Sequence, residues 1–139
     1  MRAWIVVSAL LAMTGVASAA TVVAVKLGDP TDPKAMTMSV DKTSVKAGAV
    51  EFDVTNVSKA TVHEMIVVSV KNKDEKLPVD AKKDQVDEGK IKDLGEAADL
   101  DPGQQKSLKL TLKPGAYLLI CNQTGHYMQG MKTNFTVTK

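Results

Sequence analysis

The chain has 139 residues, with 18 lysine and arginine residues against 16 aspartate and glutamate residues, two histidines and one cysteine. This length is enough for one domain with a substantial core but not for two. The near-neutral charge, without a dense basic patch interleaved with aromatic residues, does not favour nucleic acid as a partner.

The first 19 residues have the pattern of an export signal. Arg2 precedes a nearly uninterrupted apolar run, and Ala17-Ser18-Ala19 has the small residues of a cleavage site. We predict a signal peptide over residues 1–19 and a domain over residues 20–139, with cleavage after Ala20 as a near alternative. An uncleaved membrane anchor is the other interpretation, but the apolar run is short for a span of about 20 residues. The sequence therefore predicts an exported protein, periplasmic or associated with the cell envelope.

Short segments rich in β-branched or alternating residues follow, separated by turns. Strands are predicted over residues 21–27, 36–40, 50–57 and 62–70, with a short extended link over 43–46. Met36 and Met38 lie two residues apart on one face, which favours core packing over a role in shuttling copper. His63 lies near the start of its strand, where the chain leaves the preceding loop.

Residues 71–100 have a different character. Lysine and acidic residues dominate, and Pro78, Gly89 and Gly95 interrupt any long helix. We predict a charged surface excursion with short helical turns at most, and we assign no chemistry to it because a charged run is normally a solvated face.

The C-terminal part returns to strands. Residues 107–112, 116–121 and 133–138 are strand-like, and turn sequences at 101–103 and 113–115 precede the first two of them. The chain then has about seven short strands and no βαβ pattern. It is predicted to be all-β, a Greek-key β-sandwich.

Cys121, His126 and Met131 follow one another with four residues between each pair. In an oxidising compartment, a lone cysteine pairs with another chain, remains a reactive liability or binds a ligand; a buried structural thiol is the simpler alternative. The adjacent histidine and methionine favour ligand binding, because a thiolate, two imidazoles and a weak thioether are the donors expected at a blue copper site. Under that hypothesis His63, the only other histidine, supplies the second imidazole.

The segment from Leu112 to Val137, together with Val62-His63-Glu64, resembles the cupredoxin family of plastocyanin-like and azurin-like proteins, and within it the sulfocyanin-like and rusticyanin-like group. The resemblance implies a β-sandwich that binds one type 1 copper ion. It implies that the metal ligands are His63, Cys121, His126 and, at a longer distance, Met131. It also implies an electron carrier that cycles between Cu(I) and Cu(II), and we expect a monomer whose redox partner proteins dock near His126.

Several residues around these ligands have two interpretations. Many members of the family have asparagine after the first histidine, where this chain has Glu64; a carboxylate there could lower the reduction potential or make it pH-dependent, although alternation should turn it away from His63. Asn122 either ties the ligand loop by side-chain hydrogen bonds or is an ordinary turn residue. Tyr127 and Met128 are expected to form an apolar docking rim, with loop packing as the alternative for Tyr127.

Copper storage or delivery and enzymatic activity are the alternatives to electron transfer. The domain could store copper or deliver it to a cuproenzyme, although delivery sites tend to be exposed and rich in methionine and histidine. Multicopper enzymes need further histidine clusters, and a thiol nucleophile lacks an acid partner here. We therefore expect no enzymatic activity and no small-molecule substrate.

Overall fold

The structure is a computed structural model that describes residues 18–139. Residues 1–17 of the predicted signal peptide lie outside the described residues. Within residues 18–139, no helix has the length and apolar composition needed to cross a bilayer.

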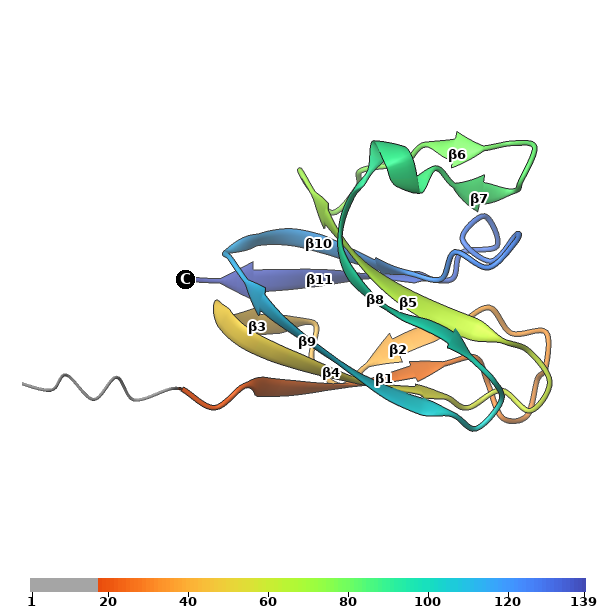
Figure 1. The fold of residues 1–139 in the computed structure, drawn as a ribbon, viewed down its shortest axis with the longest axis horizontal. Helices are drawn as coiled ribbons and strands as arrows, with labels where there is room; N and C mark the ends of the chain where they lie inside the picture. Colours follow the sequence, from red (N-terminus) through yellow and green to blue (C-terminus); the bar gives the residue numbers. More distant parts are fainter. Residues whose placement is uncertain (1–17) are drawn as a thin grey trace, which may run out of the picture.

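Two sheets form the body of the molecule (Figure 1). The four-stranded sheet contains β1 (Thr21–Leu27), β2 (Met38–Val40), β4 (Gly48–Asn56) and β9 (Gln105–Leu112), in the order β2-β1-β4-β9. The five-stranded sheet contains β3 (Ser44–Lys46), β5 (His63–Val70), β8 (Lys92–Leu100), β10 (Gly115–Ile120) and β11 (Lys132–Thr138), in the order β3-β11-β10-β5-β8. The pairs β1–β4 and β3–β11 are parallel, and the other pairs in these sheets are antiparallel.

The main core lies between the two sheets. Alternate residues of β1, β4 and β11 are buried, as expected for strands with one solvated face. Phe52 of β4 and Phe135 of β11 meet edge to face at the centre, with ring centroids 5.3 Å apart. Each such side chain contributes about 1.5–3 kcal/mol when fully buried, so this apolar layer holds the sheets together.

A third layer covers the outer face of the five-stranded sheet. It consists of residues 71–91, here called the cover segment, with the short strands β6 (Val79–Asp80) and β7 (Gln85–Val86) and the 3₁₀ turn η1 (Glu88–Lys90). Leu77 and Val86 point inward and form a second apolar cluster with residues of β5 and β10, including Ile66 and Ile120. Because β5 and β10 are covered on both faces, most of their residues are buried rather than alternating.

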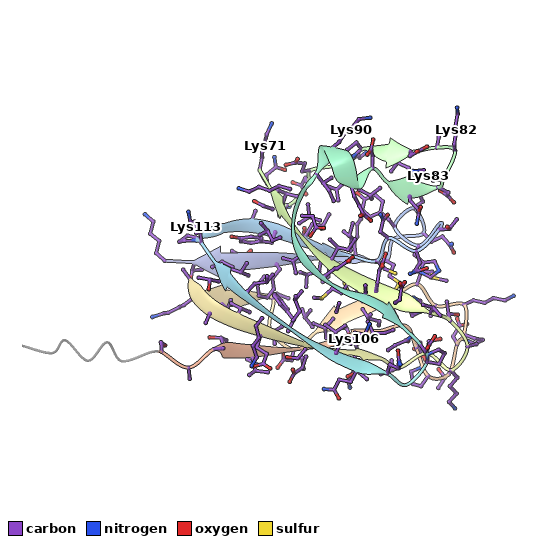
Figure 2. All side chains as sticks on the ribbon, viewed as in Figure 1. Lys71, Lys82, Lys83, Lys90, Lys106 and Lys113 are labelled. Atoms are coloured by element: carbon purple, nitrogen blue, oxygen red, sulfur yellow. The ribbon has the colours of Figure 1, made fainter. Side chains whose placement is uncertain are left out.

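The charged residues of the cover segment point away from this cluster. Its lysines are exposed, and Figure 2 shows Lys71, Lys82 and Lys90 projecting from its outer side. Lys90 pairs with Asp87 at 2.9 Å, an exposed contact that contributes at most about 1 kcal/mol. The segment is therefore amphipathic, and its few apolar residues are the ones that attach it to the sheet.

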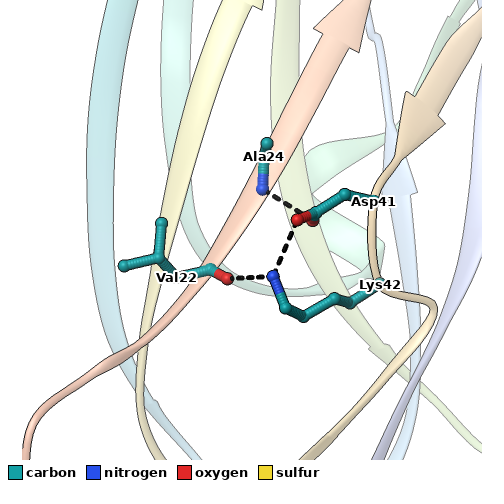
Figure 3. A network of polar contacts seen from close by, with 4 residues as sticks. All are labelled: Val22, Ala24, Asp41 and Lys42. Atoms are coloured by element: carbon teal, nitrogen blue, oxygen red, sulfur yellow. Dashed lines mark hydrogen bonds and ion pairs between the residues drawn. The ribbon is translucent and has the colours of Figure 1, made fainter.

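A small polar network fixes the start of β1 (Figure 3). The Ala24 N–H donates to Asp41 Oδ1 at 2.8 Å, and Lys42 Nζ donates to the Val22 carbonyl at 2.9 Å. Lys42 also pairs with Asp41 at 2.7 Å. These contacts tie the connection between β2 and β3 to the edge of β1.

The all-β sandwich prediction is confirmed, but one local prediction was wrong. Residues 92–100, expected within the surface excursion, form the nine-residue strand β8 beside β5. The link at 43–46 contains strand β3, which pairs with β11. The predicted helical content of the excursion is limited to η1. The pairs β5–β8 and β3–β11 are long-range contacts, which segment composition alone does not indicate.

Candidate metal centre

The candidate donors are brought together by the pairing of β5 with β10. His63 is the first residue of β5, and Cys121 directly follows the last residue of β10. The two strands run antiparallel, with Ile66 opposite Ile120, so the start of one lies beside the end of the other. His126 and Met131 belong to the loop that connects β10 to β11.

Three donor atoms converge at this end of the sandwich. His126 Nδ1 lies 3.3 Å from Cys121 Sγ and 3.3 Å from His63 Nδ1, while Sγ lies 4.0 Å from His63 Nδ1. All three residues are buried. Two imidazoles therefore turn the same ring nitrogen toward one thiol, an arrangement that suits coordination of a single ion.

The loop that carries His126 and Met131 closes back onto Cys121. The Met131 N–H donates to the His126 carbonyl at 3.0 Å, and the Cys121 N–H donates to the Met131 carbonyl at 3.1 Å. Gly125 and Gly130 turn the loop with φ of 79° and 94°, values that favour glycine. Met131 is fully buried and belongs to the same apolar cluster as Cys121.

The Nε2 side of the His63 ring is held by packing rather than by a hydrogen bond. Its Nε2 is buried and has no hydrogen-bond partner among residues 18–139. A Cβ at Gly28 would lie 2.9 Å from that Nε2 and 2.8 Å from the Cβ of Ser58, so Gly28 and Ser58 close around the ring. The sequence indicated Gly28 only as the end of a strand, so its contact with His63 was missed.

The electrostatics of the site favour neutral imidazoles. Burial lowers the pKa of His63 to about 4, with a smaller effect from His126, and burial also lowers the pKa of His126. Both rings therefore keep lone pairs available for a metal at neutral pH. Burial raises the pKa of the Cys121 thiol to about 11, although backbone N–H groups of Glu64 and Gln123 oppose this. A bound cation would reverse this balance and favour the thiolate.

The carboxylate of Glu64 contacts the backbone behind the donors. It accepts the Asn122 N–H at 3.1 Å, while the Glu64 N–H approaches Cys121 Sγ at 3.4 Å. Burial raises the pKa of Glu64 to about 7, with further contributions from Glu96 and Asp99. Glu64 thus links β5 to the cysteine loop twice, through its carboxylate to the Asn122 N–H and through its own N–H to the Cys121 sulfur.

Asn122 ties the cysteine loop to the cover segment. Its side chain hydrogen-bonds with the backbone of Val86 and with Glu88, and its carbonyl accepts from Gln85. Of the two roles considered for Asn122, the structure has the loop-tying one. The sequence did not indicate its hydrogen-bond partners, because they lie in the charged stretch to which no chemistry was assigned. The isolated apolar residues Leu77 and Val86 were the available signal that this stretch packs on the sheet.

The surface nearest the donors lies beside His126. The His126 side is slightly open, with 8% of the residue exposed against none of His63. Met128 is 58% exposed and borders a hollow of about 270 Å³ together with Lys76, Leu77 and Lys132. Tyr127 lines the same hollow but is mostly buried, and its hydroxyl accepts the Leu77 N–H at 3.2 Å. Tyr127 therefore packs the loop, and Met128 is the exposed apolar residue.

The donor set is chemically selective. One thiol and two imidazoles suit copper or zinc, and a buried thioether next to them adds the soft, weak donor that copper sites use. Within the described residues, His63, Cys121 and His126 form the one group of three potential metal-binding side chains with donor atoms within 4.8 Å of one another. The residues present therefore fit a single copper ion.

Comparisons with known proteins agree with this geometry. A family model described as a cupredoxin-like domain matches residues 1–137. No curated protein sequence matches the chain. The structure is similar to that of auracyanin from the photosynthetic bacterium Roseiflexus castenholzii, with 23% identity, a TM-score of 0.62 and coverage of 88% of this chain and 99% of that one. Auracyanin B is also similar, with 26% identity, a TM-score of 0.60 and coverage of 88% of this chain and 91% of that one. Rusticyanin from Thiobacillus ferrooxidans has 18% identity and a TM-score of 0.64, with coverage of 87% of this chain and 79% of that one.

Proposed function

Because the chain belongs to the cupredoxin-like domain family, we propose that it is an exported type 1 (blue) copper protein that carries single electrons between redox partner proteins. The observation that carries the proposal is the convergence of one thiol and two imidazole Nδ1 atoms in a buried site. The similar structures support it, because rusticyanin is described as a copper protein and reduced forms of auracyanin and rusticyanin are known.

In this proposal Cys121, His63 and His126 would be the strong ligands of the copper ion and Met131 would be a weak fourth ligand. The copper ion supplies a one-electron couple between Cu(I) and Cu(II). Thiolate and thioether donors favour Cu(I), while imidazoles suit both oxidation states. The protein contributes a site in which the ligand positions are set by β5, β10 and the closed loop, so little rearrangement opposes the transfer of an electron.

We place the docking surface for redox partners around the exposed Met128. His126 is the slightly exposed histidine of the site, and the hollow is lined by Tyr127 and Met128, the two residues that follow it in the chain. Lys76 and Lys132 border the hollow, and Lys132 Nζ lies 4.6 Å above the Tyr127 ring. A partner would therefore meet a small apolar contact flanked by lysines. In this proposal the domain only carries electrons and has no catalytic activity of its own.

Addition of Cu(II) to the metal-free protein tests the proposed function. We expect an intense blue or green absorption band and a reversible one-electron reduction potential. The Cys121→Ser variant should lose the band, because the colour requires the thiolate, whereas Ser107→Ala on the exposed face of β9 should keep it. A colourless complex that binds only Cu(I) would contradict the proposal and favour copper delivery, and a Cys121→Ser variant with the full band would refute the ligand assignment.

We also propose that residues 1–19 are removed during export, which leaves a periplasmic or envelope-associated domain of residues 20–139. The first strand begins at Thr21, so cleavage after Ala19 removes no part of the sheets. The mass of the protein recovered from the cell envelope should correspond to a chain that begins at Ala20. A mass that includes residues 1–19 would instead indicate an uncleaved anchor.

A further inference from the structure

The side chain of Asn122 is held on all sides by the cover segment. The Val86 N–H donates to Asn122 Oδ1 at 2.6 Å, and Asn122 Nδ2 donates back to the Val86 carbonyl at 3.1 Å. The same Nδ2 donates to Glu88 Oε1 at 2.8 Å. Asn122 is 1% exposed, so both its polar atoms are satisfied away from water by one short stretch of chain.

Further hydrogen bonds hold the backbone around Asn122. Gln85 Nε2 donates to the Asn122 carbonyl at 2.8 Å, and the Gly125 N–H donates to the Asp84 carbonyl at 2.8 Å. The fit at the second contact is close, because a Cβ at Gly125 would lie 3.1 Å from Asp84 Oδ2. The chain is therefore fixed immediately after Cys121 and immediately before His126.

The cover segment is itself anchored independently of Asn122. Leu77 and Val86 pack with Ile120, Leu118 and Tyr127 in the second apolar cluster. The Leu77 N–H also donates to the Tyr127 hydroxyl. The polar contacts to Asn122 therefore extend from a segment that apolar burial already holds in place, and they act on the part of the loop that separates two donors.

We propose that Asn122 and residues 84–88 position Cys121 and His126 for metal binding, so that the cover segment presets the ligand loop before the metal arrives. This inference rests on the proposed function. Asn122 touches neither donor atom; it acts by fixing the backbone that carries them. Removing it should leave the sandwich intact and let the Cys121 and His126 side chains spread over more orientations.

Copper binding by the Asn122→Ala variant tests the proposal. Competition titration should give Cu(II) affinity about 10–100-fold below that of the parent protein, the range found when residues that support metal ligands are removed. The absorption band and the reduction potential should both shift, which loss of fold stability alone would not cause. Asn134→Ala, an exposed position on β11, is the matched control and should change none of the three.

Three further variants distinguish a positioning role from simple misfolding. Gln85→Ala removes one bond to the Asn122 carbonyl and leaves the side-chain contacts of Asn122, so a smaller loss of affinity is expected. Asn122→Asp replaces the amide that donates to Glu88 by a carboxylate, so two acceptors face each other. Adding Glu88→Gln restores a donor–acceptor pair, because the new amide at position 88 can donate to the new carboxylate at position 122. The double variant should bind Cu(II) more tightly than Asn122→Asp alone.

Hydrogen exchange in the metal-free protein separates this proposal from the proposed function. The Gly125 amide should exchange at least about tenfold faster in Asn122→Ala than in the parent or Asn134→Ala, because local opening of the loop becomes easier. If the parent never turns blue but this difference is present, the electron-carrier function fails and the positioning role stands. Affinity within threefold of the parent, together with an unchanged band, potential and exchange rate in Asn122→Ala, would overturn the inference.

Discussion

At the scale of single residues, Gly28 packs against the His63 ring and limits its position. Gly28 has φ of +76° and leaves no room for a Cβ beside His63 Nε2. Gly28→Ala should therefore destabilise the fold by about 1–3 kcal/mol through overpacking, in addition to the strain of a positive φ. It should also weaken copper binding, because the displaced ring carries a proposed ligand atom.

Gly103→Ala is a matched control for this substitution. Gly103 has φ of +81°, close to that of Gly28, but a Cβ there would meet nothing within 4 Å. Both variants carry the same backbone strain, so the difference between their unfolding free energies, measured in urea, reports the packing against His63. Equal losses in the two variants, with equal copper affinity, would show that the contact has no effect.

Met131→Leu tests the proposed weak thioether ligand while preserving the core. The two side chains are similar in size, so the unfolding free energy should change by less than about 1.5 kcal/mol. The reduction potential should rise by roughly 60 mV or more, the shift equivalent to a tenfold change in a one-electron equilibrium. Although a thioether suits Cu(I), the hydrocarbon that replaces it makes the site more apolar, and this penalises the doubly charged Cu(II) more than the singly charged Cu(I). Voltammetry measures this, and Met38→Leu, a buried methionine of β2, should leave the potential unchanged.

At the scale of elements, the cover segment depends on a few apolar side chains. Leu77 is 6% exposed and packs in the cluster outside β5 and β10. Leu77→Ala should cost about 2–5 kcal/mol of unfolding free energy, because it removes apolar contacts and leaves a cavity over the sheet. Chemical denaturation measures the loss, and Leu108→Ala, at a half-buried position of β9, should cost less.

The sequence predicted some elements better than others for physical reasons. The strands with one solvated face were found because their apolar residues alternate, as in β1, β4 and β11. β8 was missed because Asp93, Glu96 and Asp99 give it the composition of a charged loop, and because Gly95 lies near an irregularity in its pairing with β5. An edge strand needs few apolar residues, and composition does not distinguish it from a surface loop.

The candidate site also contains residues that the sequence indicated and residues that it did not. Its donors could be predicted because the chain has one cysteine and two histidines, so each donor could be assigned. The contacts of Asn122 and Gly28 could not, since they depend on which segments fold against the loop. Local spacing therefore indicated the candidate donors, while the residues that contact them could be recognised only from the three-dimensional arrangement.

At the scale of the whole molecule, Met128 is the feature with a testable effect on electron exchange. Met128→Lys would place like charges together when two copies meet at the His126 side, which costs about 1 kcal/mol for a pair about 4 Å apart in water. The electron self-exchange rate, measured by NMR line broadening, should fall about fivefold, and added salt should reduce the difference. The absorption band should not change.

Val22→Lys is the control for that experiment. Val22 is the other large hydrophobic residue exposed among the described residues, at 44%, and it lies on β1 of the opposite sheet. The same charge introduced there should leave self-exchange nearly unchanged. An equal effect at both positions would indicate a general charge effect and would count against docking at Met128.

The place of β11 in the five-stranded sheet determines when the metal site can assemble. β11 lies between β3 and β10, and the loop from Cys121 to Met131 ends where β11 begins. In a nascent polypeptide that emerges N-terminus first, the candidate donors are therefore all released before β11, the strand that closes the loop into the sheet. We therefore expect the loop to hold its candidate donors in place only after β11 has joined the sheet. Chains truncated before Lys132 should keep Cys121 open to alkylation, whereas the full-length domain should protect it.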